Sequence, residues 1–276
     1  MTYFRNFALL TLMPVLVLSA CTSKKDKLDP LTVERPAEEI FKEAQDADKN
    51  GEYSKATTLY SEVERQHPYS DLATQAQIRQ AEVAYDNLKY DDAIVAIDRF
   101  VELHPGHPNV DHMYYLKAMC YYEQITDVRR DQAMTQSALE ALDTVINRFP
   151  DSKYSREAHF KKDLVVDHLA GKEMDVGRYY QQKEQYNAAI NRFNNVVKYY
   201  QTTTHVPEAL HRLVESYTAL GLKDEATRVA AVLGHNYPGS QWYKDSYDLL
   251  DPAQRAKLKD TRSWVDRTIS GLLKPD

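Results

Sequence analysis

The sequence predicts an all-α solenoid of about five stacked helical hairpins that ends in a C-terminal capping helix. The first supporting observation is a pair of small residues, Ala81 and Ala93, placed where two consecutive helices would have to approach closely, with Pro105 ending the second helix. The second is that this pattern recurs along the chain. The third is the composition, with 28% charged residues and only 8 Gly among 276 residues. Because one hairpin cannot bury its apolar face alone, such repeats have to stack.

The pattern recurs in phase, with two altered copies in the middle of the chain. The landmark residues of the successive copies are Ala44, Ala56, Tyr60 and Pro68; Ala81, Ala93, Ile97 and Pro105; Ala118, Tyr121, Ala138, Leu142, Val145 and Pro150; Gly177, Tyr180, Ala189, Phe193 and Val196; and Val214, Ala226, Ala230 and Pro238. The third copy has additional residues between its helices, and the fourth has Gln201 where proline is expected. The pattern resembles the tetratricopeptide repeat, which implies a right-handed solenoid.

Residues 1–20 have the pattern of a lipoprotein signal peptide. Arg5 gives a positive start, and the apolar run from Phe7 to Leu18 is too short to span a bilayer. The run closes on L-S-A-C, ending at Cys21, which resembles the lipobox of bacterial lipoproteins. This resemblance implies cleavage before Cys21 and attachment of a diacylglycerol to its thiol. The alternative is an ordinary signal peptide followed by a coincidental cysteine.

Residues 21–36 are expected to be a lipidated, flexible tether. Thr22 and Ser23 follow the cysteine, so no aspartate stands there to suggest retention at the inner membrane. The lipid anchor is therefore expected at the periplasmic face of the outer membrane, where acyl chains hold the protein without spanning the bilayer. Cys120 would then have no disulfide partner. It is expected to be a buried core thiol, with a reactive or intermolecular cysteine as the alternative.

The solenoid itself is expected over residues 37–276. Its repeats are predicted near 37–70, 71–107, 108–152, 153–203 and 206–240. The third repeat carries a charged, exposed insertion from Thr126 to Gln136. After Pro150 the chain holds more helix than one hairpin needs, so either one long bent helix or an additional helix is expected there. Asp251 and Pro252 predict the start of a cap over residues 251–273. Its apolar stripe consists of Leu258, Trp264, Val265, Ile269 and Leu272.

Three histidines, His104, His107 and His112, cluster at the join between the second and third repeats. Histidines this close could bind a metal. Pro105 and Gly106 beside them are typical of a plain inter-helix turn, however, and we favour that interpretation. The sequence therefore predicts no metal site.

The chain is not expected to be an enzyme. None of the common phosphate-binding, nucleophile-elbow, zinc-protease or C-x-x-C motifs occurs in it, and no cofactor is expected. The net charge of −6 argues against binding to nucleic acid, which usually requires a basic face.

The remaining candidate site is a surface. The first helices of stacked hairpins line the concave side of such a solenoid, and aromatic residues with an occasional arginine suit peptide binding there. The candidate residues of this substrate groove are Phe41, Ile78, Arg79, Tyr85, Tyr115 and Tyr122. The alternative is that Ile78 and Tyr115 belong to the core between repeats.

Several segments carry a more specific resemblance. They are A-I-D-R-F-V-E-L-H-P-G-H-P-N-V-D from Ala96 to Asp111, R-D-Q from Arg130 to Gln132, the pair Tyr179 and Tyr180, and A-A-I-N-R-F from Ala188 to Phe193. Together with the lipobox and the repeats, they are similar to the BamD family, the tetratricopeptide lipoproteins of the outer-membrane β-barrel assembly machinery.

The resemblance implies a non-enzymatic subunit that binds the periplasmic domains of BamA and unfolded outer-membrane β-barrel proteins, alongside other assembly lipoproteins. It associates the amino-terminal repeats with substrate and the carboxy-terminal repeats with BamA. Arg192 matches an arginine of the family that takes part in the BamA contact, and we expect it to pair with a carboxylate of the partner. The alternative is a pilotin-type or other envelope adaptor with the same anchor and fold.

Overall fold

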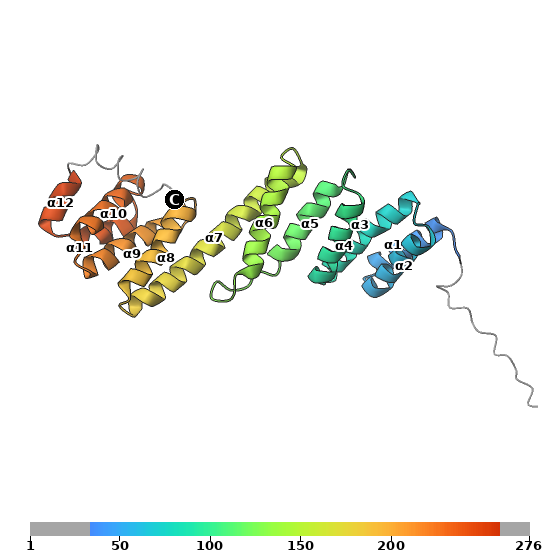
Figure 1. Cartoon of the computed structure of the whole chain (residues 1–276), viewed down its shortest axis with the longest axis horizontal. Coiled ribbons are helices and arrows are strands. Elements are labelled where there is room, and N and C mark those ends of the chain that lie inside the picture. The colour runs from blue at the N-terminus through green and yellow to red at the C-terminus, as the bar shows by residue number, and fades with distance from the viewer. Residues whose placement is uncertain (1–33, 260–276) are drawn as a thin grey trace, which may run out of the picture.

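The helices of this protein stack side by side in sequence order. The computed structural model describes residues 34–259, which contain twelve helices. Neighbours in the sequence are neighbours in space along an elongated stack (Figure 1). The first ten helices are α1 (Ala37–Lys49), α2 (Tyr53–Gln66), α3 (Asp71–Asp86), α4 (Tyr90–Leu103), α5 (Val110–Tyr122), α6 (Ala133–Arg148), α7 (Lys153–Gln182), α8 (Tyr186–Tyr199), α9 (Val206–Ala219) and α10 (Lys223–Asn236). The predicted all-α class with five consecutive hairpins is confirmed.

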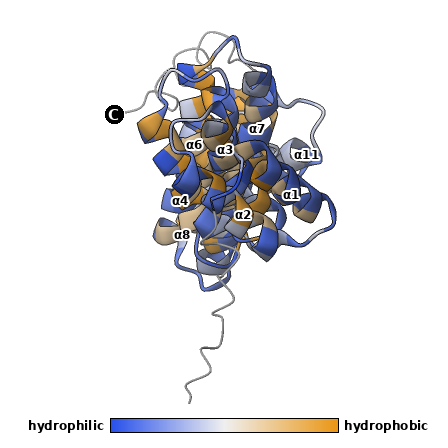
Figure 2. Cartoon of the chain, turned by 90° about the vertical axis from the view of Figure 1, so that its right-hand side faces the viewer, coloured by the Kyte–Doolittle hydropathy of each residue, from blue (hydrophilic) through white to orange (hydrophobic). Residues whose placement is uncertain are grey.

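Small residues let the two helices of a hairpin approach closely, as the sequence pattern indicates. Ala44 of α1 and Ala56 of α2 are completely buried, and so are Ala81 of α3 and Ala93 of α4. Apolar side chains fill the space around these contacts and form successive core clusters along the stack. Viewed along the stack, much of the hydrophobic sequence lies toward the middle and hydrophilic residues cover much of the outside (Figure 2). Burial of these faces against neighbouring hairpins is what stabilises the solenoid.

Four of the five hairpins share the same turn. In each, the residue two positions after the C-cap of the first helix donates its backbone N–H to a carbonyl in the last turn of that helix. Examples are the bonds from Glu52 to Ala47 and from Leu222 to Tyr217. This bonding pattern requires one residue with positive φ. Gly51 and Gly221 supply it in two of the hairpins, with φ of 74° and 75°, and Leu88 and Glu184 supply it in the other two, each with φ of 59°. The common turn places each second helix antiparallel to its first.

The third hairpin differs, because the insertion replaces its turn with a loop between α5 and α6. The helix that follows is also unusual. Where the sequence left open one bent helix or two helices, α7 is a single helix of 30 residues, with Ser152 as its N-cap. It packs against α5 and α6 and also against α8, so it connects the third hairpin to the fourth.

Beyond α10, two short helices cover the end of the stack. They are α11 (Gln241–Leu249), which the sequence analysis did not identify, and α12 (Pro252–Lys259). The predicted start of the cap at Asp251 carries a capping box, because its carboxylate accepts from the Gln254 N–H at 2.9 Å and the Gln254 side chain accepts from the Asp251 N–H at 3.0 Å. Leu258 packs against the last core cluster. The rest of the predicted stripe, Trp264, Val265, Ile269 and Leu272, lies outside the described residues.

No helix between residues 34 and 259 combines the length and the apolar character that crossing a bilayer requires.

Candidate functional site

The predicted substrate-groove residues divide into buried and accessible members. Phe41, Ile78 and Tyr115 are each less than a tenth exposed and pack in the cores of the first three hairpins. Arg79 is exposed, whereas Tyr85 and Tyr122 are half-buried. The alternative interpretation of Ile78 and Tyr115 as core residues therefore fits their burial. The sequence pattern could not distinguish a groove-lining residue from an inter-repeat core residue, since both recur at the same helical positions.

Three of the six candidates share one hollow, between α1, α3 and the turn before α5. Its volume is about 440 Å³, and its lining residues are Phe41, Gln45, Gln75, Ile78, Arg79, Glu82, His107, Pro108 and Asn109. Tyr122 borders a different hollow beside α7, with Ile125 and Leu164. The six residues therefore do not line one continuous cavity.

Glu82 is the central charged group of the first hollow. Its carboxylate accepts a hydrogen bond from Arg79 Nη1 at 2.9 Å, and its other oxygen lies 2.9 Å from His112 Nε2. Burial by itself would raise the pKa of Glu82, but the hydrogen bond to His112 and the charge of Arg79 outweigh it and lower the pKa overall. The hollow thus combines an apolar floor with a carboxylate that stays ionised at neutral pH. Such a combination suits an extended peptide with apolar side chains.

The histidines at this join have separate partners. His104 Nε2 lies 2.9 Å from Gln77 Oε1, while the His107 ring accepts from the Asn109 N–H at 3.1 Å. Across the described part of the chain, no group of three His, Cys, Asp or Glu side chains is arranged to hold a metal ion. The other cysteine considered above, Cys120, is completely buried, and burial raises the pKa of its thiol to about 12. Cys21 lies outside the described residues.

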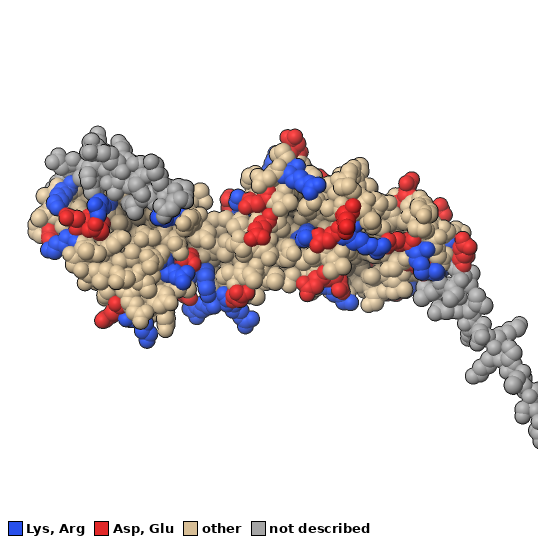
Figure 3. Space-filling view, viewed as in Figure 1, with Lys and Arg blue, Asp and Glu red and all other residues tan. Residues whose placement is uncertain are grey.

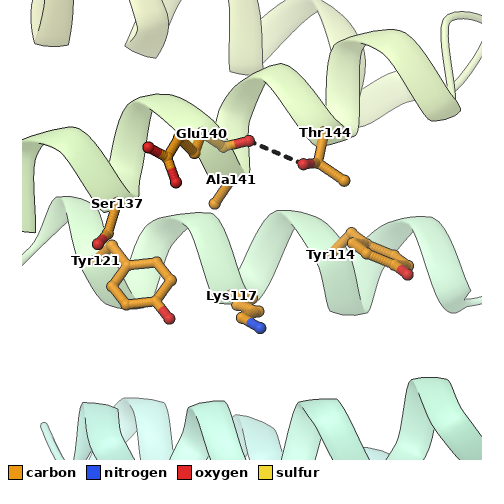
Figure 4. Close-up of a pocket in the computed structure, with 7 residues that line it drawn as sticks. All are labelled: Tyr114, Lys117, Tyr121, Ser137, Glu140, Ala141 and Thr144. Atoms are coloured by element: carbon orange, nitrogen blue, oxygen red, sulfur yellow. Dashed lines mark hydrogen bonds between the residues drawn. The ribbon is translucent and has the colours of Figure 1, made fainter.

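A shallow pocket that the sequence analysis missed lies between α5 and α6. Figure 4 shows its lining residues Tyr114, Lys117, Tyr121, Ser137, Glu140, Ala141 and Thr144. Lys117 Nζ is paired with Asp98 of α4 at 2.6 Å, and Arg148 donates to the Tyr114 hydroxyl. Tyr114 and Tyr121, two helical turns apart on α5, were the available signal. Their side chains lie along one edge of the pocket in Figure 4.

Arg192, the predicted contact to a partner, lies on α8 and faces α7. Its Nη1 donates to both carboxylate oxygens of Glu173, at 3.2 and 3.4 Å, and Asn195 Nδ2 donates to the same carboxylate at 2.9 Å. The Arg192 side chain is 42% exposed, whereas that of Glu173 is 17% exposed. A guanidinium has five donors in a rigid fork, so the side chain can hold Glu173 with one nitrogen and present the others outward. Glu173 could not be identified from the sequence, because no local pattern links it to a residue on the next helix.

The chain matches a family model and relatives whose names refer to the outer membrane. The family model YfiO, described as an outer membrane lipoprotein, matches residues 33–233. The chain is 44% identical to the outer membrane protein assembly factor BamD of Caulobacter vibrioides, over 97% of this chain and 90% of that protein. It is 43% identical to the protein of the same name from Rickettsia prowazekii, over 85% of this chain and 92% of that protein. Among solved structures, it is similar to the TPR domain of P58(IPK), with a TM-score of 0.40 and 14% identity over 86% of this chain and 63% of that one.

Proposed function

Because the chain belongs to the BamD family of outer membrane protein assembly factors, we propose that it binds the periplasmic domains of BamA and unfolded β-barrel proteins as a subunit of the assembly complex. The observation that carries this proposal is the 44% identity, which extends over nearly the whole chain rather than over one repeat. The protein is an outer membrane lipoprotein of a family of assembly factors, and its predicted lack of enzymatic activity agrees with that membership. Other assembly lipoproteins are its expected neighbours.

Attachment to the membrane is assigned to Cys21, the residue after the predicted signal peptide. Three acyl chains on this cysteine would anchor the protein effectively permanently, since each buried methylene contributes about 0.8 kcal/mol. Mass spectrometry of the amino-terminal peptide tests this assignment. We expect a lipidated Cys21, and an unmodified amino-terminal cysteine would refute the anchor.

The contact to BamA is assigned to Arg192. Its support is the geometry between α7 and α8: Glu173 of α7 orients the half-exposed guanidinium of Arg192 on α8, which can still pair with a carboxylate of a partner. The test is a pull-down of the lipidated protein from detergent-solubilised envelopes, with mass spectrometry of the retained proteins. We expect BamA with the wild type and its loss with Arg192→Glu.

A matched control for this pull-down is Arg156→Glu. Arg156 is exposed near the start of α7, far along that helix from Glu173, so its reversal makes the same change in net charge. If Arg192→Glu still retains BamA, the assignment of this contact to Arg192 is refuted. Recovery of a secretin in place of BamA would instead favour the alternative, a pilotin-type adaptor.

Substrate binding is assigned to the hollow beside Phe41, Ile78 and Arg79. Its apolar floor and charged rim fit an unfolded segment with exposed apolar side chains. Because Phe41 and Ile78 are buried, a photocrosslinking residue belongs at Gln75 or Arg79, which are exposed on the rim. We expect these positions to capture a β-barrel peptide, with a crosslinker at exposed Lys183 as the control. Equal capture at all three positions would contradict a specific site.

A further inference from the structure

The insertion in the third hairpin forms a short, well-bonded loop that carries two adjacent arginines. The backbone N–H of Arg130 donates to the carbonyl of Asp127 at 2.9 Å, and that of Arg129 donates to the Asp127 carboxylate at 2.8 Å. At the other end of the loop, the Asp131 carboxylate accepts from the Ala133 N–H at 3.2 Å. Both carboxylates of the loop are thus used to hold its backbone, whereas neither guanidinium is.

Helix α7 holds this loop in place. Lys172 Nζ donates to the carbonyls of Arg129 and Arg130, at 3.1 and 3.3 Å. The Val128 side chain packs against Gly171, where a Cβ would come within 3.5 Å of it. The loop is therefore fixed against the middle of α7 through its backbone, and its arginine side chains are not needed for that attachment.

The two guanidinium groups are largely free to meet a partner. Arg129 has a side chain that is 80% exposed, and its ion pair to Asp175 is long, at 3.8 Å. Arg130 is also exposed, and it forms no ion pair within residues 34–259. Figure 3 shows Lys and Arg gathered where the loop between α5 and α6 hangs below the stack. An exposed ion pair of this kind contributes at most about 1 kcal/mol, so the arginines add little to folding.

We propose that this arginine loop, residues 126–132, is a second docking point for the protein partner assigned to Arg192, and that it binds an acidic surface of that partner. The proposal rests on the function proposed above. Its basis is a shared support, because Lys172 holds the loop and the adjacent Glu173 holds Arg192. One turn of α7 therefore organises both cationic groups, and guanidinium forks match carboxylates in paired hydrogen bonds.

An acidic protein surface fits the loop better than an anionic membrane does. Juxtamembrane segments that bind acidic lipids usually carry about four to eight basic residues. This loop has two, and Asp127 and Asp131 stand on either side of them. In addition, α1, which follows the proposed lipid anchor, lies several helices away along the stack (Figure 1).

The test is the binding of purified BamA periplasmic domains to the full-length protein in detergent. The variant is Arg129→Glu with Arg130→Glu, and we expect its Kd to rise about tenfold or more at low salt, with a smaller ratio at high salt because exposed charges are screened. The conservative variant Arg129→Lys with Arg130→Lys keeps the charge but loses the fork geometry, so we expect an intermediate Kd.

The matched control is Lys49→Glu with Lys89→Glu, which makes the same change in charge at exposed turns of the first two hairpins. An unchanged Kd in the arginine-loop variant, with weakened binding in Arg192→Glu, would overturn this inference and leave the proposed function standing. Failure of the wild type to bind would overturn both. Flotation with phosphatidylglycerol vesicles forms the last arm, and loss of vesicle binding rather than BamA binding would assign the loop to lipid.

Discussion

Two glycines on the same helix should respond differently to the same substitution. Both Gly171 and Gly177 lie inside α7, where alanine is favoured over glycine by up to about 1 kcal/mol. A Cβ on Gly171 would meet His205 Nε2 at 3.4 Å and Val128 at 3.5 Å, which are ordinary van der Waals contacts. A Cβ on Gly177 would lie 2.4 Å from Cε1 of Phe193 and within 3 Å of two more atoms of that ring.

The ring of Phe193 cannot move away from such a Cβ, since it is completely buried between α7 and its neighbours. Overpacking of this kind costs about 1–3 kcal/mol. Gly171→Ala is therefore expected to stabilise the protein by up to about 1 kcal/mol. Gly177→Ala is expected to be about 1–3 kcal/mol less stable than Gly171→Ala, because the two share the gain in helix propensity and only one has the clash.

Urea unfolding followed by circular dichroism measures the difference, with the two variants compared at equal slope m. A shift of α8 away from α7 would also displace Arg192, so Gly177→Ala should weaken binding to BamA more than Gly171→Ala does. Equal unfolding midpoints for the two variants would refute the argument from the contact with Phe193.

Three further predictions concern single side chains. Although burial raises the pKa of Glu215, hydrogen bonds from His211 and a neighbouring arginine lower it from 4.5 to about 2. Because the pKa of Glu215 is lower in the folded protein, its contribution to stability is present above pH 4.5 and is lost as the pH falls toward 2. We expect the free energy of unfolding to fall by roughly 2–3 kcal/mol over this range in the wild type and not in Glu215→Gln. Parallel pH profiles of unfolding for the two proteins would contradict this. Glu173→Ala should raise the Kd for BamA several-fold only while Arg192 is present, whereas a lower Kd would show that Glu173 competes with the partner. The Cys120 thiol should react with a maleimide only as fast as the protein unfolds, and rapid labelling of the native protein would contradict its burial.

The architecture was predictable from the sequence because it depends on local rules. A close approach of two helices needs a small residue on each, so Ala81 and Ala93 revealed a hairpin without any knowledge of what packs around it. The cap at Asp251 was equally local, since the capping box links residues three positions apart. Helix α11 was missed because it is short and buries little: Ser246 is its single fully buried residue.

The candidate sites depended on contacts between repeats, which no local pattern encodes. The same helical position can face a groove or a neighbouring hairpin, and only the packing showed that Ile78 and Tyr115 lie mostly inside. A resemblance was enough to name Arg192. The orientation of its side chain, however, comes from Glu173, which lies on the preceding helix.

The sequence by itself therefore determined the repeat and the family, since each rests on residue types at fixed spacing. The tertiary structure alone decided which side chains remain accessible and which charges meet. Accessibility and charge pairing are set by the stacking of one hairpin on the next, and α7 shows this most clearly: its consecutive residues Lys172 and Glu173 hold two elements that the sequence keeps far apart.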